Sequence, residues 1–442
     1  MLLRTLKIYN KNEFALLLVF ALTSRVLFLL SLGACTALAS DEEAYLEILD
    51  SLFSIDLWSQ TLPTNGNPLS YYLWLIPAKL LTLIGIPNWI ALRITSLLFF
   101  TFSILLIFRL LRNVIPRFIL SKFLIAITFI PSFFIYTSLG IRESFIIFLI
   151  AFVFYELSLF HTNKKLFNLV FYFLGLTVLC QIKWFLGLIL FVSTFWILFL
   201  EGRKFWVRCF KIIFFLSMLL TFSLSNAVLQ TVKTVDFNSV VDPAIKNKTN
   251  ELRVFFKDTP KKISEEDNKP ISSTVLKLQE CKELNKLGFL ENFDFTKNLL
   301  VNIKLPHSSQ HTPATDFAYL ENGNTVRHVS EAPVTFLLFW FSPLFSGHDG
   351  LISKLFFEGF IWGVLIFFVF IRFSSFLAKK RKIEPIQFSA CAFIILYMIF
   401  CAFTEVNIGT SMRHRAILLF PTVIALFGAG SSFFRSRGNH NQ

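Results

Sequence analysis

The sequence predicts an all-α fold, a polytopic bundle of membrane-spanning helices. The chain has 442 residues, of which 55% are hydrophobic and 57 are phenylalanine. A soluble domain of this size must cover most of its exterior with polar side chains, and this composition leaves too few of them. Apolar runs of roughly 18 or more residues recur along the chain, which is the length that a helix needs to cross ~30 Å of hydrocarbon.

Basic residues gather in short segments between the apolar runs, as the positive-inside rule predicts for cytoplasmic loops. We therefore interpret the net charge of +14 as a membrane signal rather than as nucleic-acid binding. Both termini are basic and are expected in the cytoplasm. We predict a multi-pass protein of a bacterial inner or plasma membrane. Four internal segments are also placed there: 109–122, 164–165, 203–211 and 372–382.

The set of spans that fits this topology has about ten members. The first includes Arg25 and is long enough to be retained as a helix rather than removed as a signal peptide. The expected spans are 13–33, 88–108, 121–138, 144–161, 166–181, 185–201, 209–229, 351–372, 386–404 and 413–431.

Two further apolar stretches, 69–86 and 334–347, are expected to lie at the extracytoplasmic surface as interfacial or re-entrant segments. Counting 69–86 as a span would put the basic segment after it outside. These choices divide the chain into an N-terminal transmembrane module with a first outer loop over 34–87, an extracytoplasmic insert and a C-terminal transmembrane module. Their ranges are 1–229, 230–333 and 334–442.

Acidic residues open the first outer loop. Asp41, Glu42 and Glu43 follow the first span, with Tyr45 close behind. One interpretation is a solvated loop that helps to set orientation. The other is a general base, or carboxylates that hold an acceptor hydroxyl or a metal ion. We predict catalytic roles for Asp41 and Glu42.

A second acidic position lies between two expected spans, where Arg142 precedes Glu143. An ion pair at the end of a membrane helix is costly unless it is structural or functional. The carboxylate could simply complement the dipole of the next helix. We nevertheless predict that Glu143 is catalytic and that Arg142 binds substrate.

Three basic residues fall on the predicted outer side, against the positive-inside trend. Lys183 separates two spans, and Arg413 and Arg415 open the last one. A single such residue would be read as snorkelling to the interface. Three on one side suit an anionic lipid head group such as a polyprenyl phosphate, because arginine can grip phosphate oxygens in pairs.

The histidines and cysteines show no spacing typical of a metal site, so no cofactor is predicted with certainty. A divalent cation at Asp41 and Glu143 is the one metal considered. No internal repeat is evident.

Taken in order, these residues resemble the membrane glycosyltransferases of the GT-C superfamily. The closest likeness is to the family 39-like branch of protein mannosyltransferases and the aminoarabinose transferase. That branch has an acidic motif after the first helix, a Pro-Pro-Leu-Tyr-Tyr-like segment, a Gly, an Arg opening a span, a second acidic position, a Lys, and an Arg-x-Arg before a Pro. The matching residues are Asp41-Glu42-Glu43-Ala44-Tyr45, Asn67-Pro68-Leu69-Ser70-Tyr71-Tyr72, Gly85, Arg93, Pro131, Glu143, Lys183, Arg413-His414-Arg415 and Pro421.

The resemblance implies an inverting hexosyl- or pentosyltransferase. It would move a sugar from a polyprenyl-phosphate donor to a glycan, lipid or protein acceptor outside the cytoplasm. Asp41 would be the base or hold the acceptor, with help from Glu42 or Glu43, and Glu143 would be a second acidic residue. Substrate binding would fall to Glu43, Tyr45, Tyr71, Tyr72, Arg93, Arg142, Lys183, Arg413 and Arg415. The family usually has Asp at the position of Glu143 and paired prolines before Leu69, and the insert has no family counterpart.

Two alternatives stay open. One is a polysaccharide polymerase of the O-antigen type, which would use an oligosaccharide on a lipid diphosphate. The other is a lipid-linked sugar flippase or other transporter, which predicts ionisable residues deep in several spans and internal symmetry.

Overall fold

The structure is a computed structural model. It describes residues 2–31, 40–52, 68–112, 114–199, 356–379, 384–404 and 408–428, and these residues form helices joined by short turns, with no strand among them. The expected span 209–229, the insert 230–333 and the segment 334–347 lie outside the described residues. The helices are α1 (Leu2–Ser31), α2 (Ser40–Ser51), α3 (Pro68–Leu83), α4 (Asn88–Leu111), α5 (Arg117–Ile127), α6 (Pro131–Ser138), α7 (Glu143–Asn163), α8 (Leu166–Ile182), α9 (Trp184–Phe199), α17 (Phe356–Lys379), α18 (Pro385–Thr404) and α19 (Ile408–Phe427).

Proline starts or precedes several of these helices. Pro116 and Pro87 are the N-caps of α5 and α4, and Pro131 occupies the first turn of α6. A proline at this position costs no backbone hydrogen bond, because the first amides of a helix have no intrahelical partner. Inside a helix a proline removes one backbone hydrogen bond, as Pro77 does in α3 and Pro421 in α19.

The region 121–138, which we expected to be a single span, is two helices. Helices α5 and α6 are separated by a short break and bent by 76° relative to each other. Pro131 explains the break, because its ring excludes a continuous helix through residues 127–131. The pair is therefore a broken span or a re-entrant turn.

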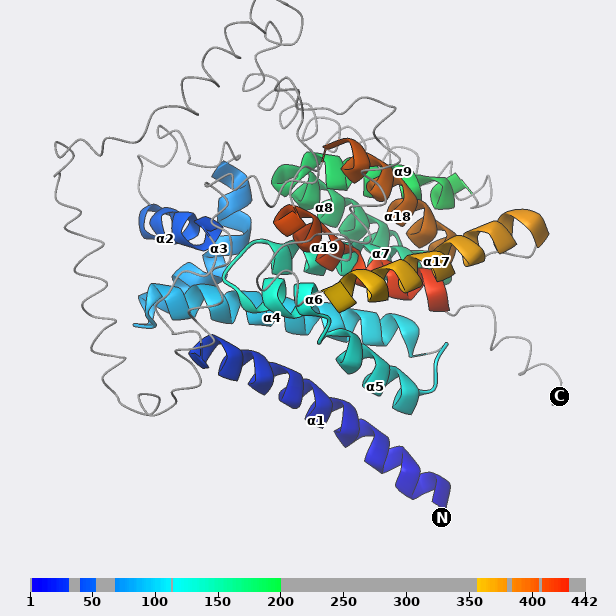
Figure 1. Cartoon of the computed structure of the whole chain (residues 1–442), viewed down its shortest axis with the longest axis horizontal. Helices are drawn as coiled ribbons and strands as arrows, with labels where there is room; N and C mark the ends of the chain where they lie inside the picture. The colour runs from blue at the N-terminus through cyan, green and yellow to red at the C-terminus, as the bar shows by residue number, and fades with distance from the viewer. Residues whose placement is uncertain are drawn as a thin grey trace, which may run out of the picture.

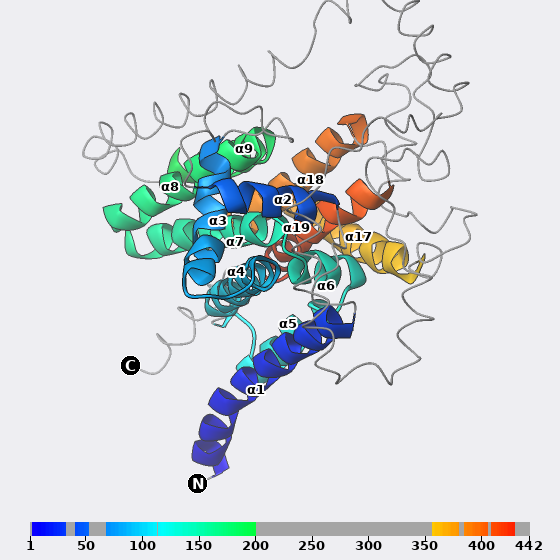
Figure 2. The same ribbon diagram turned by 90° about the vertical axis from the view of Figure 1, so that its left-hand side faces the viewer.

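Arg25 of α1 bridges this break from the side. Its guanidinium is fully buried, donates to the Thr128 carbonyl over 2.8 Å and to Thr137 Oγ1 over 3.3 Å, and lies over the Phe100 ring. Because carbonyls at a helix C-terminus carry partial negative charge, the cation complements the end of α5. Helix α1 thus packs along α5 on one side of the bundle (Figures 1 and 2).

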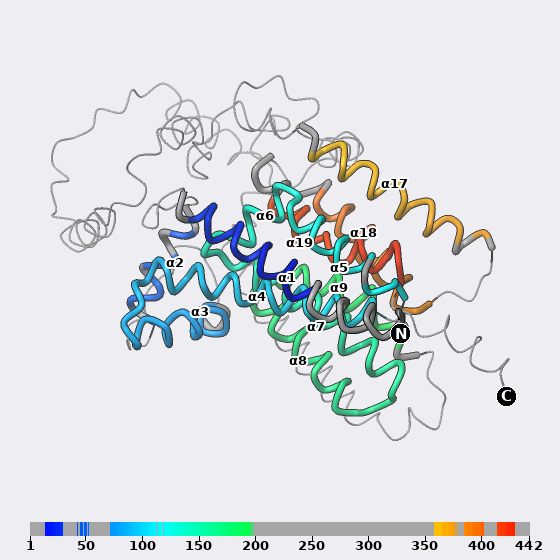
Figure 3. Tube along the Cα trace, turned by 90° about the horizontal axis from the view of Figure 1, so that it is seen from below, coloured from blue at the N-terminus to red at the C-terminus, as the bar shows by residue number. Residues whose placement is uncertain are grey.

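The centre of the bundle is formed by α4, α7, α18 and α19, with α8 and α9 packed on α7 and α18. Helices α2 and α3 gather at one end, beside the beginning of α4 (Figure 3). Among the described residues, three helices are long and apolar enough to cross a membrane, namely Asn88–Leu111, Glu143–Asn163 and Glu358–Ser375, or four if the bent pair counts as one span. Large apolar side chains such as Phe167 and Phe367 are exposed on the outside of the helices, as lipid-facing residues would be.

Contacts between distant segments define two ends of the bundle. At one end Arg413 meets Glu143 and Lys183 meets His414. At the other, Arg372 donates to the Leu426 carbonyl. The 21 residues of α7 separate Glu143 from the basic pair after it by roughly 30 Å. The acidic and basic candidate residues therefore lie at the opposite end from the Lys164–Lys165 turn.

Candidate functional site

Glu143 lies at the start of α7, where the chain leaves a short turn over residues 139–142, here called the Gly140 turn. Its side chain is fully buried. Oε1 forms an ion pair with the Arg413 guanidinium from α19. Oε2 is also buried and has no hydrogen-bond partner among the described residues. Because burying a carboxylate oxygen without a donor is costly, this atom indicates a place for a hydroxyl, a water molecule or another donor.

Three cations lie within electrostatic reach of this carboxylate: Arg413, Lys183 and Arg142. Arg142 directly precedes α7, and its buried Nε has no hydrogen-bond partner among the described residues. Burial lowers the pKa of Arg142, and the neighbouring Tyr45 and Glu143 outweigh that effect, so the net shift is upward. The guanidinium therefore keeps its charge beside the carboxylate.

Lys183 reaches the same place from the break between α8 and α9. Its ammonium lies 3.1 Å from Nε2 of His414. A charged lysine can only donate, so Nε2 accepts and His414 is neutral with its proton on Nδ1. Nδ1 lies 3.7 Å from Sγ of Cys401, which then accepts weakly. We call Arg142, Glu143, Lys183, Arg413 and His414 the Glu143 cluster.

The turn that carries Lys183 depends on Gly187. A Cβ atom at Gly187 would lie 2.2 Å from Sγ of Cys180 and 3.0 Å from that residue's backbone nitrogen. Only glycine allows α9 to approach the end of α8 this closely. Its amide donates to the Lys183 carbonyl over 3.2 Å.

A second buried carboxylate borders the cluster. Glu358 of α17 accepts from the Ser132 amide over 2.9 Å and from Trp362 Nε1 over 3.2 Å. It therefore caps the first turn of α6, and it lies within electrostatic reach of the fully buried Arg415. Glu358 and His414 were not among the site residues predicted from the sequence. Glu358 could have been found, because a carboxylate inside an expected span is a functional candidate by default.

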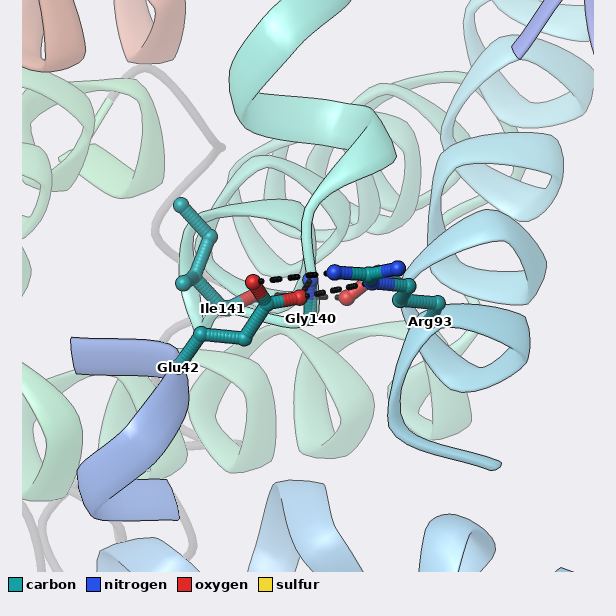
Figure 4. Close-up of polar contacts among 5 residues, drawn as sticks. Glu42, Arg93, Gly140 and Ile141 are labelled. Carbon is teal, nitrogen blue, oxygen red and sulfur yellow. Dashed lines mark hydrogen bonds and ion pairs between the residues drawn. The ribbon is translucent and has the colours of Figure 1, made fainter. Parts of the chain in front are cut away.

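Glu42, from α2, lies on the other side of the Gly140 turn and is fully buried. Arg93 of α4 donates to Oε1 over 2.9 Å and to Oε2 over 3.3 Å. The Gly140 amide donates to the same Oε1 over 2.9 Å. Figure 4 shows the carboxylate lying between the guanidinium and the turn. We call Glu42, Arg93 and Gly140 the Glu42 bridge.

The predicted aromatic residues pack beside the bridge. Tyr45, Tyr71 and Trp74 are almost completely buried, and Tyr45 meets Trp74 edge-on with the ring centroids 4.9 Å apart. Tyr45 and Tyr71 lie within electrostatic reach of Arg142. Tyr72 is only half-buried. Helices α2 and α3 thus reach the Glu143 cluster through Tyr45 and Tyr71, and α2 also reaches the Gly140 turn through Glu42.

Asp41 and Glu43 belong to α2, but their side chains lie outside the described part of the structure. Their predicted roles stay predictions. In the part of the chain that the structure describes, no three His, Cys, Asp or Glu side chains gather as a metal site. The divalent cation considered at Asp41 and Glu143 stays a prediction, because the Asp41 side chain lies outside the described residues.

The arrangement suits one kind of chemistry. A carboxylate with an unengaged oxygen can accept a proton, and fixed cations beside it can stabilise a negative charge that develops nearby. These groups come from three separate regions of the sequence and meet at one end of the bundle. A search of protein-family models finds no match for this chain, and a search of curated proteins finds none either.

Proposed function

We propose that the chain is a membrane glycosyltransferase. It moves a sugar from a polyprenyl-phosphate-linked donor to a glycan, lipid or protein acceptor on the extracytoplasmic side. The observation that carries the proposal is the Glu143 carboxylate, which is fully buried, has one oxygen paired to Arg413 and keeps the other without a protein donor in the described structure.

The reaction follows from these groups. Oε2 of Glu143 takes the proton of the acceptor hydroxyl, and the hydroxyl oxygen attacks C1 of the sugar. The bond between C1 and the phosphate oxygen breaks, and its electron pair leaves with the polyprenyl phosphate. The attack from the opposite face inverts the configuration at C1. The proton rests on Glu143 until it is passed to solvent.

In this reaction the cations of the cluster stabilise the leaving phosphate. The leaving phosphate gains one negative charge as the glycosidic bond breaks. Lys183 and Arg142 are the cations that we assign to it, while Arg413 holds Glu143 in place. Fixed cations in a buried site stabilise a developing charge without reorganisation, which lowers the barrier. The long apolar helices fit a substrate whose tail is a lipid.

A transporter of lipid-linked sugars is the second candidate. Ionisable residues buried inside helices favour it, namely Arg25, Glu156, Glu358 and Arg415. However, Arg25 and Glu358 are engaged by helix ends within the bundle. That arrangement fits structural roles, so transfer remains the better supported function.

One experiment separates the two. The full chain is purified and reconstituted in liposomes with tritium-labelled polyprenyl-phosphate glucose, mannose or arabinose in the outer leaflet, and membranes lacking the chain supply acceptors. Transfer is measured as label released from the lipid, and flipping as label protected from a membrane-impermeant oxidant.

We expect release of label with at least one of the donors. Protection of label without release, by all donors, would establish the transporter instead. Release only from a lipid-diphosphate oligosaccharide, tested in parallel, would establish the polymerase.

A further inference from the structure

We infer that Glu42 is a positioning residue, which sets the direction in which the Gly140 turn presents Arg142 and Glu143. This inference rests on the proposed function for its effect on catalysis. Its structural part concerns the turn alone. The sequence had suggested that Glu42 acts on the substrate itself.

The first step is that the Glu42 carboxylate is already engaged. Oε1 accepts from Arg93 and from the Gly140 amide, and Oε2 accepts from Arg93. The group is fully buried and Arg93 is 4% exposed. A buried carboxylate whose two oxygens already accept charge-assisted hydrogen bonds holds its donors firmly, because such bonds are about twice as strong as those between neutral groups.

The second step is that, besides the Arg93 side chain, the Glu42 carboxylate holds a backbone group. The Gly140 amide belongs to the connection between α6 and α7, and it cannot join either helix ladder there. A Cβ atom at this position would lie 2.7 Å from Cγ of Leu92 and 3.0 Å from Oε1 of Glu42. The turn therefore touches α4 and α2 with its backbone, which only glycine permits.

The third step is that the turn is fixed on both sides of Gly140 and passes directly into the cluster. The Ile141 carbonyl accepts from Ser96 of α4 over 3.4 Å. The Leu139 amide is bonded to Ile135 of α6, and the Arg142 carbonyl already accepts from Ile146 of α7. Any shift of Gly140 must therefore move the first turn of α7, where Glu143 meets Arg413.

A matched control exists on the same helix pair. Asn88 of α4 donates to the Asp50 carboxylate of α2. Of the two residues, Asp50 is exposed and Asn88 is half-buried. Their contact also ties α2 to α4, but it does not reach the Gly140 turn. Asp50→Asn therefore reports what loosening α2 does by itself.

The test has two readouts on the full chain in lipid nanodiscs. The first is amide hydrogen exchange of a peptide covering residues 139–146, which needs no substrate. We expect Glu42→Ala to speed exchange at Gly140 by about tenfold or more, because a buried amide loses its acceptor. Glu42→Gln, which keeps an acceptor oxygen, should lie between wild type and Glu42→Ala, and Asp50→Asn should match wild type.

The second readout is transfer from the donor found to be active. We expect Glu42→Ala to lower kcat by about tenfold or more with little change in donor KM, because misplaced catalytic groups cost rate rather than binding. Gly140→Ala should do the same with the Glu42 side chain intact. The Gly140→Ala variant therefore tests the inference even if Glu42→Ala does not fold.

The outcomes are distinct. Unchanged exchange at Gly140 in both Glu42→Ala and Gly140→Ala overturns the inference, whatever the activity. An equal increase in Asp50→Asn also overturns it, because loosening α2 would then be the whole effect. Faster exchange with unchanged kcat removes the catalytic part. If the variants exchange faster but the wild-type protein transfers no sugar, the proposed function is contradicted and the anchoring role of Glu42 stands.

Discussion

The buried carboxylate of Glu143 pairs with the guanidinium of Arg413, although the two residues lie 270 positions apart in the chain. The pair joins the first turn of α7 to α19, and so ties the N-terminal module to the C-terminal one. The desolvation cost of burying two charges is offset only when the charges attract each other in good hydrogen-bonding geometry. The pair is therefore both a structural contact and a constraint on where Glu143 can act.

Arg413→Ala should destabilise the protein, because it removes the guanidinium that forms the ion pair with a fully buried carboxylate. The expected loss is about 3–5 kcal/mol of unfolding free energy. The loss of stability can be followed as a fall in the midpoint temperature of thermal unfolding in detergent or nanodiscs. The double variant Arg413→Ala/Glu143→Gln should recover part of the loss, by roughly 0.5–3 kcal/mol of coupling. Strict additivity of the two single changes would mean that the ion pair contributes nothing to stability.

Lys183→Gln should weaken donor binding with little effect on folding. A hydrogen bond to a charged group contributes about 1.5–3 kcal/mol, so the dissociation constant for polyprenyl phosphate should rise by roughly tenfold or more. Titration in nanodiscs measures it. Lys165→Gln is the matched control, because Lys165 is exposed at the N-cap of α8, at the far end of the bundle. Equal weakening by both changes would indicate general attraction of the lipid to positive charge.

Gly187→Ala should cost more stability than Gly175→Ala. Both changes place a methyl group inside a helix, so the gain in helix propensity is the same. At Gly187 the new Cβ meets backbone atoms of Cys180 at 3.0 Å, whereas at Gly175 it meets the side chains of Val153 and Phe152. Overpacking of this kind costs about 1–3 kcal/mol. Equal thermal midpoints for the two variants would show that the backbone between α8 and α9 can shift to accommodate the methyl group at little cost in stability.

Local signals in the sequence predicted much of the helical frame. Polar breaks at Arg142-Glu143 and at Lys183 stand between apolar runs, and the structure begins α7 at Glu143 and breaks between α8 and α9 at Lys183. The division of 121–138 was missed, because its apolar residues continue through Pro131 and hydrophobicity alone does not show a bend. The number of spans and their direction stay predictions.

The candidate site was predicted in part. Glu143, Lys183 and Arg413 were expected on one side, and the structure brings them together. What could not be predicted is which partner each charge takes, because those contacts join helices far apart in the chain. Glu42 was expected to act on substrate, but only the fold shows that Arg93 and Gly140 surround it.

The most direct test of the proposed function is the initial rate of sugar transfer by Glu143→Gln beside that of Glu156→Gln. Both are glutamates of α7 with little exposure, and about 20 Å of helix separates them. Loss of a general base typically lowers the rate by about 10²–10⁴-fold, which we expect for Glu143→Gln. Glu156→Gln should keep the wild-type rate. A folded Glu143→Gln protein that transfers sugar as fast as Glu156→Gln would contradict the account.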